Sequence, residues 1–103
     1  MRKIYICHPY RDNTKENVKA VRNICRRVAM EDNLPIAPHL YLPQFISEQY
    51  ERPQALRLCL ELLALCDEVR VYSGQISEGM KIEIERAKEL NIPTVFIDEE
   101  VLV

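Results

Sequence analysis

The sequence predicts a small α/β fold, with a parallel sheet of about four strands and helices on both faces. Short β-rich apolar runs alternate along the chain with longer segments that repeat apolar residues at helical spacing. A helical segment between successive strands is the usual crossover of a parallel sheet. No repeat, linker or low-complexity segment interrupts the pattern, so residues 1–103 are expected to form a single domain.

The first strand is expected at residues 2–7, which contain KIYIC, and the loop HPYRDN follows it. Asn13 or Thr14 can cap the first helix, which should fade near residues 32–33. A second short strand is LPIAP, at residues 34–38. The apolar positions of the first helix are Val18, Val21, Cys25 and Val28.

Pro53 suits the first turn of a second helix, which should run to about Cys66. The alternating run EVRVYS then predicts a third strand, residues 72–90 contain a third helix, and PTVFID predicts a fourth strand. This order is typical of a doubly wound, flavodoxin-like or Rossmann-like sheet. The stretch from His39 to Arg52 is expected to be long and irregular, and such loops are usually functional or mobile.

The composition of the chain limits the classes of function that it can have. Hydrophobic residues make up 48% and charged residues 29%, which is the balance of a soluble globular protein. A net charge of −2 gives no electrostatic case for binding a nucleic-acid polymer or a membrane. MRKIYIC lacks the apolar segment of a signal peptide, and no apolar run is long enough to span a membrane. The four cysteines show no zinc-binding spacing, so we expect reduced thiols, no bound metal and a cytoplasmic protein.

In open parallel sheets, ligands bind outside the carboxyl ends of the strands. This rule selects HPYRDN after the first strand, PHLYLPQF after the second, SGQISEG after the third and DEE after the fourth. The first three are rich in polar and aromatic side chains. We therefore expect the chemistry of the protein in these segments.

Glu83 lies on the apolar side of the third helix. With Met80 at zero and about 100° per residue, Ile84, Ala87 and Leu90 form one apolar stripe, and Glu83 falls inside it at about −60°. A carboxylate there is partly desolvated, so its pKa should tend upward. A glutamate at the edge of the stripe could instead reach solvent or pair with Arg86 or a lysine.

The start of the same helix suits an anion. Ser77 is a good N-cap, the first backbone amides of a helix favour phosphate, and Gly79 allows a ligand or the sheet to approach closely. A phosphate at Ser77 and a reacting carbon near Glu83 would fit a phosphorylated sugar.

Several motifs in order resemble the nucleoside 2-deoxyribosyltransferase superfamily, which includes the 2′-deoxynucleoside 5′-phosphate N-hydrolases: IYIC-HPYRD, PIAPH, CDEVRVY and SEGMKIEIERAKELNIPTVFI. Within it, the sequence resembles the small bacterial and phage branch. The resemblance implies that Glu83 is the nucleophile at the anomeric carbon of a sugar, within the motif that contains Ser77 and Gly79. It also implies that Tyr5 lies close to Glu83, and that the protein forms homo-oligomers.

One position departs from this superfamily. Its enzymes carry an aspartate eight residues before the Asp that opens the third strand, and here that position is Cys59, counted back from Asp67. Glu61 is near but faces about 200° away on an ideal helix. The proton for the leaving base must then come from Tyr5, His8, His39 or Asp12, or from a neighbouring subunit, unless the protein binds without turnover.

Other loop residues have two interpretations each. Arg11 offers a donor fork for phosphate or is a solvated loop residue, and His39 faces the ligand or bonds locally. Tyr41, Phe45 and Tyr50 could stack on a base if their loop folds over the site. They could equally pack under the loop or against a neighbouring subunit, and we expect packing for at least one. Leucines almost all round the second helix predict a contact between subunits, to which Ile82 could add.

The leading hypothesis is an N-glycosidase or deoxyribosyltransferase acting on a nucleoside or nucleoside 5′-monophosphate. In it Glu83 attacks, Tyr5 orients Glu83, and Ser77 with Arg11 holds a phosphate; no metal or redox cofactor is needed. The alternatives are a nucleotide-binding sensor, sponge or regulator without catalysis, and a subunit whose fold serves only assembly.

Overall fold

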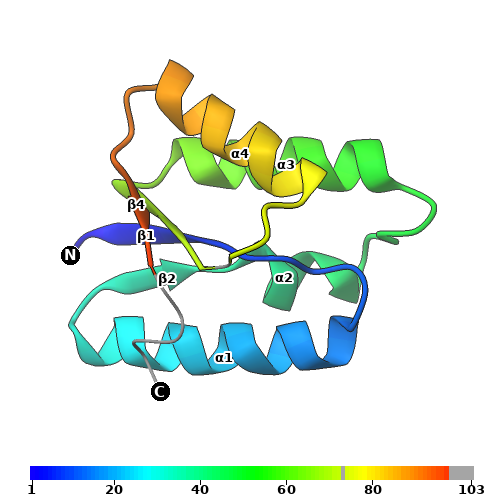
Figure 1. Ribbon diagram of the computed structural model, residues 1–103, viewed down its shortest axis with the longest axis horizontal. Coiled ribbons are helices and arrows are strands. Elements are labelled where there is room, and N and C mark those ends of the chain that lie inside the picture. The colour runs from blue at the N-terminus through cyan, green and yellow to red at the C-terminus, as the bar shows by residue number, and fades with distance from the viewer. Residues whose placement is uncertain (73, 98–103) are drawn as a thin grey trace.

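The computed structural model describes residues 1–72 and 74–97, in which four strands form one parallel sheet (Figure 1). The order across the sheet is β2-β1-β3-β4. This confirms the predicted α/β fold with a parallel sheet of about four strands. The DEE segment expected after the fourth strand lies outside the described residues. The strands are β1 (Lys3–Cys7), β2 (Leu34–Ile36), β3 (Glu68–Val71) and β4 (Thr94–Phe96).

Long helices cover both faces of the sheet, as predicted (Figure 1). One face carries α1 (Thr14–Met30), and the other carries α3 (Arg52–Ala64) and α4 (Glu78–Glu89). All three begin at the end of the sheet where the strands finish, because each crossover returns antiparallel to the strands. None of the helices in residues 1–72 and 74–97 combines the length and apolar character needed to cross a membrane.

The alternation of side chains along β1 divides the core in two. Ile4 and Ile6 pack against the buried side of α1, whereas Tyr5 and Cys7 face α3 and α4. All four side chains are fully buried. The two faces of one central strand therefore anchor both helical layers, and Tyr5 points toward the helix that carries Glu83.

The start of α1 differs from the prediction in its capping. Asn13 occupies the N-cap position with a left-handed backbone, but its side chain makes no capping hydrogen bond. The side-chain amide of Asn17 instead donates to the carbonyl oxygens of Tyr10, Arg11 and Asp12, at 3.2, 3.3 and 2.9 Å. These bonds hold the loop after β1 against the first turn of α1.

The stretch from His39 to Arg52 is more ordered than expected. It contains the end of a short helix, α2 (Pro38–Tyr41), and a 3₁₀ helix, η1 (Leu42–Gln44). Each has a proline in its first turn, where the fixed φ favours helix and the missing N–H costs nothing. The prediction of an irregular loop was therefore wrong for residues 39–44. Pro53 does lie in the first turn of α3, as predicted.

The strand order places a switch point between β1 and β3, because the chain leaves β1 toward β2 and then crosses back to β3. A ligand site is therefore expected between the carboxyl ends of these two strands.

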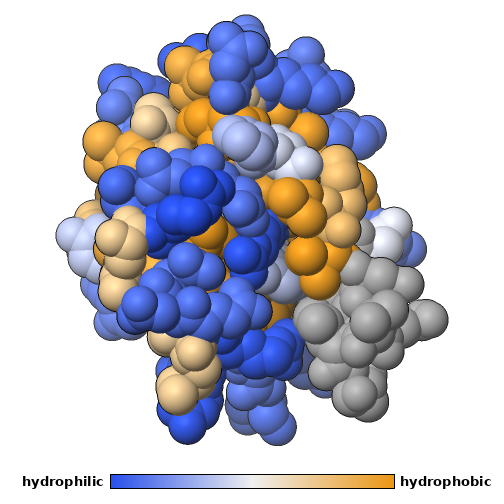
Figure 2. Space-filling model, turned by 90° about the vertical axis from the view of Figure 1, so that its left-hand side faces the viewer, coloured by the Kyte–Doolittle hydropathy of each residue, from blue (hydrophilic) through white to orange (hydrophobic). Residues whose placement is uncertain are grey.

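The end of the sheet where the strands begin, viewed in Figure 2, is mainly hydrophilic at its centre. Ion pairs of Arg2 with Glu68, at 3.0 Å, and of Lys3 with Asp67, at 3.6 Å, lie at these amino ends. Asp67, directly before β3, also accepts a hydrogen bond from the Lys3 backbone N–H at 2.8 Å.

Candidate functional site

A pocket of about 400 Å³ lies at the carboxyl ends of β1 and β3, where the topology predicts a ligand. Residues 8–12 after β1, the α2–η1 segment, one side of α3 and the first turns of α4 line it. Its volume lies within the usual range for small-molecule sites. Six predicted site residues line this pocket, namely Glu83, Ser77, Gly79, Arg11, His8 and His39.

Glu83 lies at the base of the pocket and is only 5% exposed. The Tyr5 hydroxyl donates to its Oε2, and the Cys7 thiol donates to its Oε1 at 3.6 Å. Met80 and Ala87 are buried on the same side of α4, as the helical angles predict. Arg86 pairs instead with Glu89 at 3.4 Å, so the alternative of a solvated or Arg86-paired Glu83 was wrong.

Burial raises the pKa of Glu83 to about 7, although the hydrogen bonds from Tyr5 and Cys7 favour its carboxylate. Burial also raises the pKa of Tyr5 and of Cys7, and the charge of Glu83 acts in the same direction. Both groups therefore remain protonated donors at neutral pH. Tyr5 is fully buried and does not line the pocket, so it acts on the site through Glu83.

Two histidines lie beside the pocket on neighbouring strand ends. His8 is buried, and its Nδ1 lies 2.8 Å from the carbonyl oxygen of Pro9. His39 packs beside the ring of Tyr10, with centroids 5.5 Å apart. Burial and the charge of His8 lower the pKa of His39 to about 4, so it is neutral at pH 7. Its buried Nδ1 has no hydrogen-bond partner within the described part of the chain.

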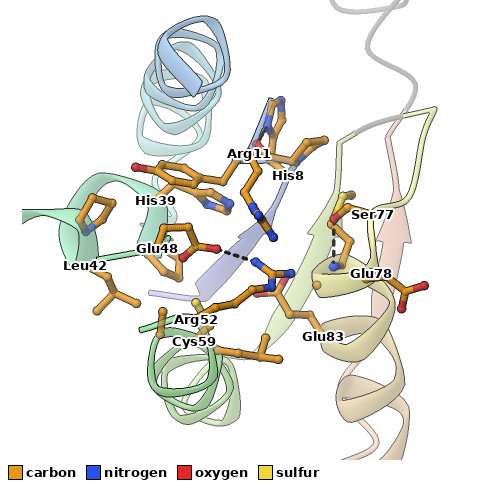
Figure 3. A pocket seen from close by; sticks show the side chains of 18 of the residues that line it. His8, Arg11, His39, Leu42, Glu48, Arg52, Cys59, Ser77, Glu78 and Glu83 are labelled. Atoms are coloured by element: carbon orange, nitrogen blue, oxygen red, sulfur yellow. Dashed lines mark hydrogen bonds and ion pairs between the residues drawn. The ribbon is translucent and has the colours of Figure 1, made fainter. Parts of the chain in front are cut away.

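The first turn of α4 has the predicted cap. The Ser77 hydroxyl accepts a hydrogen bond from the Met80 backbone N–H at 3.3 Å. A Cβ atom at Gly79 would lie 3.3 Å from Nη2 of Arg52, so the glycine allows this guanidinium to lie close to the turn. Ser77, Arg52 and Arg11 surround one part of the pocket in Figure 3. No group of three or more His, Cys, Asp or Glu side chains in residues 1–72 and 74–97 is placed to hold a metal ion.

Sequence reasoning missed the ion pair between Glu48 and Arg52. Nη1 of Arg52 lies 2.6 Å from Oε1 of Glu48, and both residues line the pocket. The available signal was their i, i+4 spacing before a helix. The aromatic residues of the same stretch, for which stacking on a base was considered, lie exposed and outside the pocket: Tyr41, Phe45 and Tyr50.

At least one of the three aromatic residues Tyr41, Phe45 and Tyr50 was expected to pack rather than to stack on a base. Tyr41 and Phe45 pack edge to face against each other, with ring centroids 5.0 Å apart. The two rings remain 59% and 55% exposed, so packing under the loop or against a neighbouring subunit stays a prediction. Neither ring lines the pocket, so the structure does not support the alternative of stacking on a base bound there.

Cys59 lines the pocket on α3 at the position where the resemblance implies an acid. Burial and the charge of Glu83 raise the pKa of its thiol to about 12, so it is a very weak proton donor. Glu61 is exposed and does not line the pocket, as its helical angle predicts. The carboxyl groups that line the pocket besides Glu83 are those of Asp12, Glu48 and Glu78.

A family model described as a domain of unknown function, DUF7768, matches residues 2–97. A search of curated protein sequences gave no significant match. Among solved structures, a 2-deoxyribosyltransferase from Bacillus psychrosaccharolyticus is 20% identical with a TM-score of 0.69, covering 91% of this chain and 70% of that one. A 2-deoxyribosyltransferase from Leishmania mexicana is 16% identical with a TM-score of 0.70, covering 94% and 64%. At these identities the likeness shows a 2-deoxyribosyltransferase-like fold.

Proposed function

The chain belongs to the DUF7768 family, and we propose that it is an N-glycosidase or deoxyribosyltransferase acting on a nucleoside or nucleoside 5′-monophosphate. The observation that carries this proposal is Glu83, a buried carboxyl group at the base of the pocket that Tyr5 and Cys7 hold by hydrogen bonds. The fold shared with two 2-deoxyribosyltransferases supports the same reaction class.

In the proposed reaction, a Glu83 carboxylate oxygen attacks the anomeric carbon of the sugar. A C–O bond to Glu83 forms while the glycosidic C–N bond breaks, and the leaving base takes the bonding electron pair and a proton. Water then releases the sugar, or a second base accepts it. A pKa of about 7 leaves a carboxylate fraction at neutral pH, and Tyr5 positions that carboxylate through its hydroxyl.

The remaining pocket residues are assigned to substrate binding. Ser77 and Gly79 at the start of α4, together with Arg11, would hold a 5′-phosphate. His8 and His39 would contact the sugar or base from the ends of β1 and β2. This chemistry needs no metal or redox cofactor, because the nucleophile is a carboxylate and the leaving group departs with a proton.

A second function, nucleotide binding without catalysis, is favoured by Cys59. Its thiol is too weak an acid to protonate a leaving base, and Tyr5 is both too weak and too deeply buried. Of the donors expected from the sequence, Asp12 and His8 remain, because His39 is neutral at pH 7. A sensor or regulator would need only the pocket.

Release of free base separates the two functions. The purified protein is incubated with deoxynucleosides, ribonucleosides and their 5′-monophosphates, and the products are chromatographed. We expect base release that Glu83→Gln abolishes and Glu85→Gln leaves unchanged, because Glu85 is exposed on the same helix. Tight binding without release from any compound would rule out the enzyme and support the binding protein.

A further inference from the structure

The Glu48–Arg52 ion pair lies at the mouth of the pocket, above Glu83. The two side chains are 29% and 35% exposed, so the pair is neither buried in the core nor fully solvated. Arg52 is the first residue of α3, and Ala55, Leu56 and Cys59 continue the pocket-lining side of that helix. Arg52 therefore stands at the outer end of the wall that leads down to Glu83.

The Arg52 guanidinium has two different neighbours. One amino group, Nη1, bonds to Glu48 at 2.6 Å, and the other, Nη2, lies over Gly79 at the start of α4. Its positive charge lowers the pKa of Glu83, whereas the charge of Glu48 raises it, so both groups act electrostatically on the base of the pocket. The Arg52 guanidinium therefore lies between α3 and the start of α4, beside the space where a substrate would lie.

A second guanidinium faces the first. Arg11 projects into the pocket from the loop after β1 and points toward Arg52 (Figure 3). Within residues 1–72 and 74–97, Arg11 has no ion-pair partner, while Arg52 has a single carboxylate. Two planar donor forks that converge on one space suit a phosphate, whose three terminal oxygens can accept from both.

We propose that Arg52 exchanges Glu48 for the phosphate of the substrate, and that this exchange makes the pocket select phosphorylated over unphosphorylated nucleosides. The inference rests on the proposed function and names its substrate class, a nucleoside 5′-monophosphate. Glu48 holds the guanidinium in place while the pocket is empty. A phosphate dianion attracts Arg52 more strongly than one carboxylate does, and the partly exposed Glu48 can turn to water when it is released.

The exchange predicts opposite effects for the two partners. Binding of inorganic phosphate and of ribose 5-phosphate is measured by calorimetry, without turnover. Arg52→Gln is expected to weaken binding of both by about tenfold to a hundredfold, the value of a charge-assisted hydrogen bond. Glu48→Gln is expected to keep or strengthen binding, because the competing carboxylate is gone. Arg57→Gln is the matched control, since Arg57 is exposed on the same helix and bonds to Gln54.

A merely structural ion pair would give a different pattern. Both Arg52→Gln and Glu48→Gln would then weaken phosphate binding together, and that result would overturn the inference. Equal binding by wild type and Arg52→Gln, or no binding by wild type, would also overturn it. If Arg52→Gln does not fold, Arg52→Lys retains the charge without the fork, and an intermediate loss of affinity is expected.

The test separates this inference from the proposed function. If phosphate binding depends on Arg52 but no base is released from any nucleotide, the inference about Arg52 is supported and the proposed enzymatic activity is rejected. If base is released with equal kcat/KM from nucleosides and from their 5′-monophosphates, and Arg52→Gln changes neither value, the enzymatic activity is supported and the inference about Arg52 is overturned. The expected result is a preference for the monophosphates that Arg52→Gln removes.

Discussion

At Glu83, burial and hydrogen bonding act in opposite directions on one carboxyl group. Removal from water favours the neutral acid, whereas donors on both oxygens favour the carboxylate, and the balance leaves a pKa of about 7. The donors, Tyr5 and Cys7, are neutral and themselves buried. They orient the carboxyl group without the full neutralisation that a buried arginine would give.

The raised pKa of Glu83 has a consequence for stability. The unfolded value is 4.5, so between pH 4.5 and about 7 the Glu83 carboxyl group binds more protons in the folded chain than in the unfolded chain. The contribution of Glu83 to the free energy of unfolding is therefore fully present below pH 4.5. As the pH rises to about 7, this contribution falls by about 3 kcal/mol. Glu83→Gln, which cannot ionise, should gain about that much free energy of unfolding relative to wild type between pH 4 and pH 8.

Urea denaturation at each pH measures this difference. Comparison with wild type cancels His39, whose lowered pKa makes the folded state gain stability as the pH rises from 4 to 6.5. Glu85→Gln serves as the matched control, because it removes an exposed carboxyl group from the same helix. A flat difference for Glu83→Gln would show that Glu83 ionises normally in the folded chain.

Single residues were predictable from sequence where a regular element fixes their direction. Helical angles placed Glu83 on the buried side of α4, and the resemblance placed Tyr5 beside it. The spacing of Glu48 and Arg52 could have indicated their ion pair, but the closeness of Arg52 to Gly79, 27 positions later on another helix, could not be predicted. No local spacing encodes that contact.

At the scale of elements, long periodic segments were predicted well and short ones were not. α1 and α4 repeat apolar residues over several turns, whereas α2 spans only Pro38–Tyr41 and has no period to recognise. The capping of α1 also escaped prediction, because the bonds come from Asn17 inside the helix rather than from Asn13. A residue inside the first turn can hold the preceding loop as well as a cap does.

The start of α4 carries the Ser77 cap and the proposed phosphate site, and substitutions at Ser77 can separate the two. Ser77→Ala removes the acceptor for the Met80 N–H and should cost about 1 kcal/mol of the free energy of unfolding. Ser77→Asp keeps a capping oxygen, so stability should stay near wild type, but its charge should repel a bound phosphate. Urea denaturation and phosphate titration of both variants give the two readouts. Phosphate binding by Ser77→Asp equal to wild type would place the anion away from this turn.

At the scale of the whole molecule, α3 is covered incompletely within one chain. Only Ala55 and Leu63 of this helix are buried, and four of its leucines are half-buried: Leu56, Leu58, Leu60 and Leu62. Leu65, directly after the helix, is 66% exposed, and Ile82 on neighbouring α4 is also exposed. Exposed apolar side chains on two adjacent helices are typical of surfaces that bind another protein.

We propose that α3 and α4 form the interface of a homo-oligomer, as the leucine-rich helix and the family resemblance led us to expect. Leu65→Glu would place a charge in the interface, whose desolvation opposes association. Sedimentation velocity over a range of protein concentrations should show an oligomer for wild type and a smaller species for Leu65→Glu. Met30→Glu is the matched control, because Met30 is 71% exposed at the end of α1, on the opposite face of the sheet. If Met30→Glu dissociates the oligomer and Leu65→Glu does not, the interface lies on α1. If the wild type is monomeric at all concentrations, the protein does not form a homo-oligomer.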